Sequence, residues 1–109
     1  VMYCGKHALS NLTIIIDNNN LQGFCRADDV ADYSKLSDTL NNFGLEAYNI
    51  DGHDLNEIEK TLSINSKKTK AIIAKTIKGK GVSFMENEFK WHYKSPNDEE
   101  LEIALKELS

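Results

Sequence analysis

The sequence predicts an α/β fold, a three-layer parallel sheet with helices on both faces. The main observation is that apolar, β-branched runs of strand length alternate along the chain with segments of helical periodicity. A second is that strands and helices alternate, which implies βαβ units with right-handed crossovers and a parallel sheet. A parallel sheet of this kind needs cover on both of its faces.

The first half of the chain predicts the end of a helix, a strand and a second helix. Residues 1–10 suit the last turns of a helix, and Leu12–Asp17 (LTIIID) is nearly continuous in apolar, β-branched residues. We therefore expect Leu12–Asp17 to be the central strand, buried on both faces. The asparagines that follow predict a tight turn. Ser34–Phe43 carries an apolar stripe and is followed by Gly44, which predicts a surface helix.

The next segments predict a further strand, helix and strand. Leu45–Ile50 alternates as a short strand, and Asp54 with Glu57 resembles a capping box at the start of a helix. Lys70–Ile77 contains the apolar run AIIA and predicts a strand that breaks at the G-K-G of residues 79–81.

The last segment predicts a helix with a strong start. Pro96 and Asn97 precede three acidic residues, which favour the positive end of the helix dipole. We expect its buried stripe to consist of Leu101, Ala104, Leu105 and Leu108.

Composition limits the class of protein. The chain has 109 residues, of which 40% are hydrophobic and 28% charged, which is typical of a folded globular domain. A net charge of −4 argues against nucleic acid as a partner, and no apolar run is long enough to cross a membrane. We expect a cytoplasmic location, and free thiols at Cys4 and Cys25. Because the chain begins with Val1, in the middle of an element, we expect a fragment.

Two loops are the places to look for chemistry, because open α/β sheets bind ligands at the carboxyl ends of their strands. The first loop offers Asn19 and the carbonyl of Leu21, two neutral oxygens that can converge on a hard cation. Asparagine-rich turns without a metal are commoner, so both interpretations stay open on these residues alone.

The second loop runs from Lys78 to His92. Histidine is the side chain that most readily transfers protons near neutral pH, although a histidine beside Trp91 is more often structural. Gly79 and Gly81 offer backbone amides to a phosphate, but G-K-G lacks the spacing of the known phosphate-binding motifs and is more often a turn.

Two other polar clusters favour structural interpretations. Six lysines occur between residues 67 and 80, and such a run is more often a solvated face than a phosphate site. In the D-G-H-D of residues 51–54, Asp54 is expected to cap a helix and Asp51 to form a turn. The role of His53 is undecided.

Taken together, these motifs resemble transketolase. The matching segments are N-L-T-I-I-I-D-N-N-N-L-Q at residues 11–22, D-G-H-D at 51–54, and K-G-K-G-V-S-F-M-E-N at 78–87 followed by W-H at 91–92. Their order and intervals match as well. The resemblance is strongest to the N-terminal section of transketolases that are split into two polypeptides, and implies that residues 1–109 are the C-terminal part of the diphosphate-binding domain of a thiamine-diphosphate-binding fold.

The resemblance implies thiamine diphosphate and Mg²⁺ as cofactors. Asn19 and the Leu21 carbonyl match two metal ligands of the family, His92 matches a catalytic histidine beside the diphosphate and the donor sugar, and Ile77 matches an apolar residue near the cofactor. There are two departures. The G-D-G motif that supplies an aspartate to the metal is absent from these residues, and Tyr93 replaces a small residue, which puts substrate choice in doubt.

The implied activity is transfer of a two-carbon glycolaldehyde unit from a ketose, such as a sugar phosphate, to an aldose acceptor, as in pentose phosphate metabolism. The implied partner is the C-terminal section with the pyrimidine-binding domain, in a heterotetramer or an assembly like a homodimer, without which we expect the isolated chain to be inactive. Two alternatives stay open. One is a thiamine-diphosphate enzyme acting on a 2-oxo acid, such as a dehydrogenase alpha subunit or deoxyxylulose-phosphate synthase, and the other is a noncatalytic remnant domain.

Overall fold

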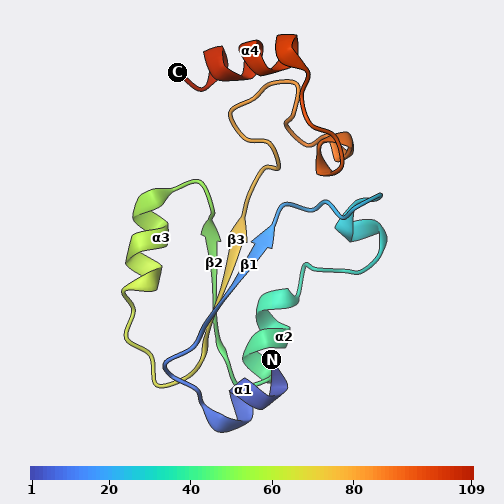
Figure 1. Cartoon of the computed structure of the whole chain (residues 1–109). Helices are drawn as coiled ribbons and strands as arrows, with labels where there is room; N and C mark the ends of the chain where they lie inside the picture. Colours follow the sequence, from blue (N-terminus) through green and yellow to red (C-terminus); the bar gives the residue numbers. More distant parts are fainter. The chain divides into compact units, whose positions relative to one another are not determined.

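The computed structural model describes all 109 residues, which form two compact units. The first unit comprises residues 1–18 and 31–76, and the second comprises residues 19–30 and 77–109. Figure 1 shows the elements of both units along the chain. Each unit is described by itself.

The first unit is built on a parallel sheet of three strands. Its strands are β1 (Thr13–Asn18), β2 (Glu46–Asp51) and β3 (Lys70–Lys75), in the order β1-β3-β2. Both pairings are parallel, with Asn18 and Asp51 each opposite Lys75. The predicted α/β class is therefore confirmed (Figure 1).

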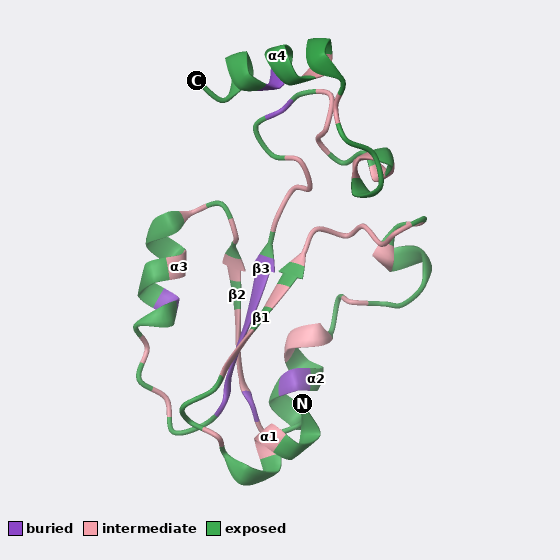
Figure 2. Cartoon of the chain, in the orientation of Figure 1, coloured by how far each residue is buried: buried purple, intermediate pink, exposed green.

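The prediction that Leu12–Asp17 forms the central strand is wrong. The strand at this position, β1, lies at an edge, and β3 lies at the centre. All of Lys70–Ala74 is buried in β3, whereas Ile15 of β1 keeps 61% of its surface exposed. Figure 2 shows the contrast between the buried β3 and its neighbours. Both strands have the apolar, β-branched composition of a buried strand, so composition did not distinguish the centre from the edge.

Helices lie on both faces of the sheet. Side chains of successive strand residues point to opposite faces, so Ala71 and Ile73 share one face and Ile72 lies on the other. The first face packs with α2 (Leu36–Asn42) through a core of Leu40, Leu45, Ala71 and Ile73. On the Ile72 face, α3 (Leu55–Leu62) packs along β2, with Thr61 buried.

A short helix, α1 (Met2–His7), packs against the end of α2. A Cβ placed on Gly5 would lie 1.7 Å from the Phe43 carbonyl oxygen, so only glycine allows this approach. Gly44 follows α2 with φ of 88°, as expected for a residue that ends a helix.

The start of α3 confirms one part of the capping prediction and corrects another. Asp54 accepts hydrogen bonds from the amides of Asn56 and Glu57. In a full capping box Glu57 would accept from the amide of Asp54, but its carboxylate accepts from the Asp51 amide instead, at 2.8 Å. The turn before the helix brings Asp51 within reach of this side chain.

The second unit contains two 3₁₀ turns and one helix. The turns are η1 (Ala27–Asp29) and η2 (Phe89–His92), and the helix is α4 (Asp98–Glu107). The helix start predicted at Asn97 is confirmed, and the structure adds a full capping box, which Asn97 and Glu100 form at the start of α4. At the other end, Glu107 accepts hydrogen bonds from the amide and the hydroxyl of Ser83.

The predicted buried stripe of α4 is wrong in large part. Ala104 is buried, but Leu101, Leu105 and Leu108 keep 45%, 60% and 62% of their surfaces exposed. The periodicity is that of an amphipathic helix, but periodicity alone does not supply the surface that covers it.

Candidate functional site

The four residues proposed for a site all belong to the second unit. Asn19 follows β1 directly, Ile77 is the second residue after β3, Leu21 lies two residues beyond Asn19, and His92 ends η2. Because β1 and β3 are parallel and in register, the chain leaves the sheet after both strands at the same edge. This is the carboxyl edge, where open α/β sheets bind ligands.

The asparagine loop folds as the expected tight turn. The Asn19 side-chain oxygen accepts a 2.9 Å hydrogen bond from the amide of Leu21. Asn20 has φ of 57°, in the left-handed region that asparagine tolerates. Its side chain both donates to the Asp28 carboxylate, at 2.8 Å, and accepts from the Asp28 amide, at 3.1 Å. Three consecutive residues are thus held by side-chain hydrogen bonds.

A small hairpin leaves the Leu21 carbonyl outside its hydrogen bonds. Leu21 and Arg26 form an isolated antiparallel bridge. The flanking bonds run from the Gln22 amide to the Cys25 carbonyl and from the Ala27 amide to the Asn20 carbonyl, at 2.8 and 3.0 Å. Leu21 is thus the non-hydrogen-bonded position of the pair, and its carbonyl takes no part in the hairpin bonds.

The donor set of this loop fits part of a magnesium site. The Asn19 oxygen keeps a second lone pair beside its bond to Leu21, and the Leu21 carbonyl is a second neutral oxygen. Mg²⁺ takes about six oxygens in near-octahedral geometry, so two neutral donors do not hold it alone. The chain contains no group of three or more His, Cys, Asp or Glu residues placed to hold a metal. A Mg²⁺ ion at this loop would need anionic ligands besides these two oxygens.

The G-K-G segment forms a turn within its own loop. Gly79 and Gly81 have φ of 73° and 94°, and a Cβ on Gly79 would lie 2.5 Å from the Met85 carbonyl oxygen. The Gly81 amide donates to the Glu86 carboxylate at 3.1 Å, and Lys80 lies 3.8 Å from the same carboxylate. An internal anion therefore occupies the amide that a phosphate would need.

Trp91 has a structural role in the second loop. Its indole N–H donates to the Phe84 carbonyl at 2.9 Å. The Trp91 ring also meets the Phe84 ring edge to face, with centroids 5.2 Å apart. The ammonium groups of Lys90 and Lys94 each lie 4.9 Å from the centre of the indole ring. These contacts fix the turn that presents the next residue, His92.

His92 is exposed, and its ring contact is with Tyr93. The two ring centroids are 4.6 Å apart, with an interplanar angle of 87°. A Cβ placed on Gly23 would lie 2.5 Å from the Tyr93 hydroxyl oxygen. The Tyr93 side chain thus spans from His92 to the segment that carries Asn19 and Leu21. The importance of Gly23 was missed at the sequence level, where its only signal was a glycine just after the asparagine loop.

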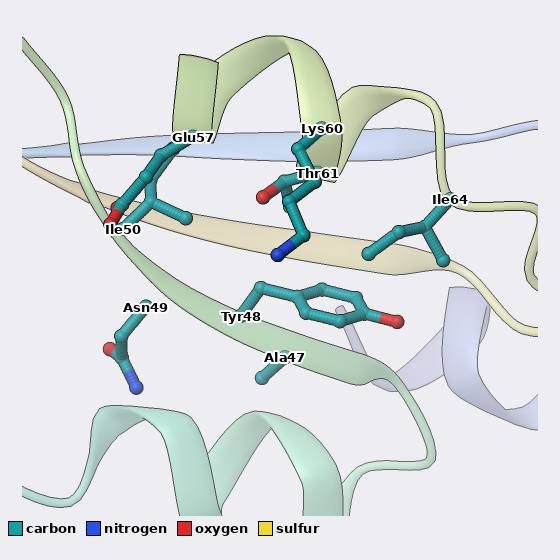
Figure 3. Close-up of a pocket in the computed structure, with 8 residues that line it drawn as sticks. All are labelled: Ala47, Tyr48, Asn49, Ile50, Glu57, Lys60, Thr61 and Ile64. Carbon is teal, nitrogen blue, oxygen red and sulfur yellow. The ribbon is translucent and has the colours of Figure 1, made fainter. Parts of the chain in front are cut away.

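An open groove lies between β2 and α3. Figure 3 shows Tyr48, Ile64, Lys60 and Glu57 along it, and all of its lining residues belong to the first unit. The pKa of Tyr48 is raised, mainly by burial and to a smaller extent by a hydrogen bond to Glu46. None of the residues predicted for the site lines this groove.

Two further findings concern the cysteines and the helices. Cys4 and Cys25 are not bonded to each other. No helix of the structure is long and apolar enough to span a membrane.

Comparison with known proteins gives matches over almost the whole chain. The chain is 39% identical to one of the subunits of the apulose-4-phosphate transketolase of Actinobacillus succinogenes, and 35% identical to the corresponding protein of Phocaeicola vulgatus, over 94% and 95% of its length. It is 32% identical to the transketolase of Rattus norvegicus over 97% of its length. No family model matches the chain.

Among solved structures, a transketolase from Campylobacter jejuni matches with a TM-score of 0.88 at 31% identity, over 96% of this chain. The chain spans only part of these proteins. It covers 38% of each of the two apulose-4-phosphate transketolase subunits and 17% of the rat and Campylobacter proteins.

Proposed function

We propose that this chain, which has the sequence and the fold of a transketolase-type domain, is the C-terminal part of a diphosphate-binding domain and works in two-carbon transfer between sugars. The observation that carries the proposal is the match of fold and sequence to transketolases over 96% of the chain, at a TM-score of 0.88. The donor of the two-carbon unit would be a ketose or ketose phosphate, and the acceptor an aldose.

Asn19 and Leu21 would be the contribution of this chain to a Mg²⁺ site. Both are supported by the loop geometry, in which the Asn19 side chain is held by the Leu21 amide and the Leu21 carbonyl stays outside the hairpin bonds. Thiamine diphosphate would supply the carbon nucleophile that carries the two-carbon unit, and its phosphates would supply anionic oxygens to the metal. Ile77 would form part of the apolar wall beside this cofactor.

His92 would bind the hydroxyls of the donor sugar and carry a proton. Its exposure in η2 leaves the imidazole accessible, while the fixed Trp91 turn limits the positions that it can take. A neutral imidazole both donates and accepts hydrogen bonds, which suits a group that meets sugar hydroxyls. His92 is therefore the residue of this chain for which we propose a catalytic role.

A partner would complete the site. Two of the similar proteins are named as single subunits of a transketolase, which supports an enzyme made of more than one polypeptide. We propose that the second polypeptide carries the pyrimidine-binding domain, and that an acidic metal ligand comes from a part of the protein outside these residues.

The decisive experiment is a donor assay on the complete protein with its partner subunit, in the presence of thiamine diphosphate and Mg²⁺. A ketose phosphate and pyruvate are compared as donors, with an aldose phosphate as acceptor. Two-carbon transfer from the ketose phosphate supports the proposal. Turnover of pyruvate alone would assign the chain to an enzyme of 2-oxo acids, and no turnover of either donor would indicate a noncatalytic domain.

A further inference from the structure

Tyr93 is placed between the two segments of the proposed site. Its ring meets the His92 ring nearly at a right angle, at 4.6 Å between centroids. At the far end of the side chain, the Tyr93 hydroxyl oxygen lies only 2.5 Å from the position that a Cβ on residue 23 would occupy. Residue 23 follows Leu21 by two positions in the asparagine loop.

The absence of a side chain at Gly23 is what allows this approach. Gly23 does not have positive φ, so its backbone would accept other residues. The Tyr93 ring carbon that bears the hydroxyl lies 3.6 Å from the same Cβ position, an ordinary contact distance. The hydroxyl alone is therefore in conflict with a methyl group at residue 23.

Tyr93 gains little from burial. It keeps 75% of its surface exposed, so hydrophobic packing does not explain where the ring lies. Its ring contacts the His92 ring, and its hydroxyl reaches the space that a side chain at residue 23 would fill. Edge-to-face contacts between rings restrict the orientation of both partners.

We infer that Tyr93 is a positioning residue, which rests on Gly23 and holds the His92 imidazole in a fixed orientation relative to the loop of Asn19 and Leu21. The inference deepens the proposed function and rests on it for the role of His92. It also gives the tyrosine at this position a purpose, since a small residue there would leave the His92 ring without this support.

The first test measures the orientation of the His92 ring without cofactor or substrate. The ¹H and ¹³C resonances of the His92 ring are recorded in the 109-residue chain, with His7 and His53 as internal controls. We expect Tyr93→Gly and Gly23→Ala to shift the His92 resonances and leave those of the other two histidines in place. Tyr93→Phe keeps the ring but loses the hydroxyl that reaches Gly23, so it should shift them less than Tyr93→Gly does.

A double mutant makes this test specific. Tyr93→Phe removes the hydroxyl that would clash with the methyl group of Gly23→Ala. The nearest remaining ring carbon lies 3.6 Å from that methyl position, which is an ordinary contact distance. Gly23→Ala should therefore shift His92 in the parent chain and have little effect in the Tyr93→Phe background. An equal shift in both backgrounds, or no response of His92 to Tyr93→Gly, would overturn the inference. Backbone amide spectra of each variant show that its fold is retained.

The second test uses the complete enzyme with its partner subunit. We expect Tyr93→Gly to lower kcat/KM for the sugar donor by about 10- to 100-fold, the cost typical of a misplaced reacting group, and Tyr93→Phe to restore most of the loss. A fully active Tyr93→Gly enzyme would overturn the positioning role. If the parent enzyme itself transfers no two-carbon unit, the proposed function fails, while the resonances of His92 still decide whether Tyr93 positions it.

Discussion

The ammonium group of Lys70 donates a 2.6 Å hydrogen bond to the carbonyl of Leu62, the last residue of α3. The same nitrogen lies 3.0 Å from the Ile64 carbonyl and 3.4 Å from the Thr61 carbonyl. Lys70 is buried, with 7% of its surface exposed. The last carbonyls of a helix lack donors within the helix and carry partial negative charge. A cation placed there both donates hydrogen bonds to these carbonyls and balances their charge. Lys70 thereby ties the end of α3 to the central strand.

Replacement of this lysine should destabilise the chain. Lys70→Met keeps most of the apolar stem but leaves the carbonyls of Thr61, Leu62 and Ile64 without their donor. We expect the free energy of unfolding to fall by about 1–3 kcal/mol, the cost of buried polar groups without partners. Urea unfolding of the parent and variant chains measures this change in the free energy of unfolding. Lys67→Met, at an exposed lysine nearby, is the matched control and should change stability by less than about 0.5 kcal/mol. Equal losses in the two variants would contradict the capping role.

The capping box of α4 gives a second prediction. Asn97→Ala removes the oxygen that accepts from the Glu100 amide at 2.8 Å. We expect the free energy of opening α4 to fall by about 1 kcal/mol, as for other helix caps. Hydrogen exchange of the α4 amides measures this locally. Ser95→Ala, just before the capping box, should leave the exchange rates unchanged, and a similar acceleration in this variant would show that the cap is not the cause.

The contact between Glu107 and Ser83 should respond to pH. The Ser83 hydroxyl and amide donate to the Glu107 carboxylate at 2.6 and 2.5 Å, and these hydrogen bonds, the hydroxyl first, lower the pKa of Glu107 below its ordinary value of 4.5. A carboxylate with a lowered pKa stabilises the fold above its unfolded pKa, and this contribution is lost as the pH falls through the folded pKa. The end of α4 should therefore loosen on acidification.

The amide resonance of Ser83 reports on this contact directly. We expect it to titrate with a midpoint below 4.5 in the parent chain. The transition should disappear in Glu107→Gln and persist in Glu102→Gln, an exposed glutamate on the same helix. A midpoint at or above the ordinary value would show that the hydrogen bonds do not favour the carboxylate in solution.

The catalytic role proposed for His92 is tested in the complete enzyme. A positioned acid or base contributes about 10²–10⁴-fold to a rate, so His92→Ala should lower turnover within that range while the melting temperature is retained. His92→Asn keeps some hydrogen bonding and should lose less. A variant that is less stable but turns over at the parent rate would indicate a structural role instead.

The isolated chain should bind thiamine diphosphate weakly. It offers two neutral oxygens to the metal, and no cluster of acidic or histidine side chains supplements them. Neutral donors compensate little of the cost of removing water from Mg²⁺. Titration calorimetry with cofactor and Mg²⁺ measures the affinity. Binding tighter than about 1 µM, or ~8 kcal/mol, would place the main contacts of the cofactor on residues other than those proposed.

The sequence by itself was sufficient for the features that depend on a few neighbouring residues. The parallel α/β pattern, the helix starts at Asp54 and Asn97 and the glycine that ends α2 were all predicted, because caps and turns are formed by residues one to four positions apart. The tight turn at Asn19 and the structural use of Asp54 belong to the same group. Resemblance of the ordered motifs to transketolase pointed to the family that the comparisons support.

Only the tertiary structure decided which strand lies at the centre, which lysine is buried and what Tyr93 contacts. β1 and β3 have similar composition, and their order follows from pairing between residues more than fifty positions apart, such as Thr13 with Lys70. Lys70 stands in a run of lysines and is distinguished only by its place at the start of the central strand. Gly23 and Tyr93 meet across a similar separation along the chain. Contacts of this kind depend on how distant segments pack together, and local periodicity carries no record of that packing.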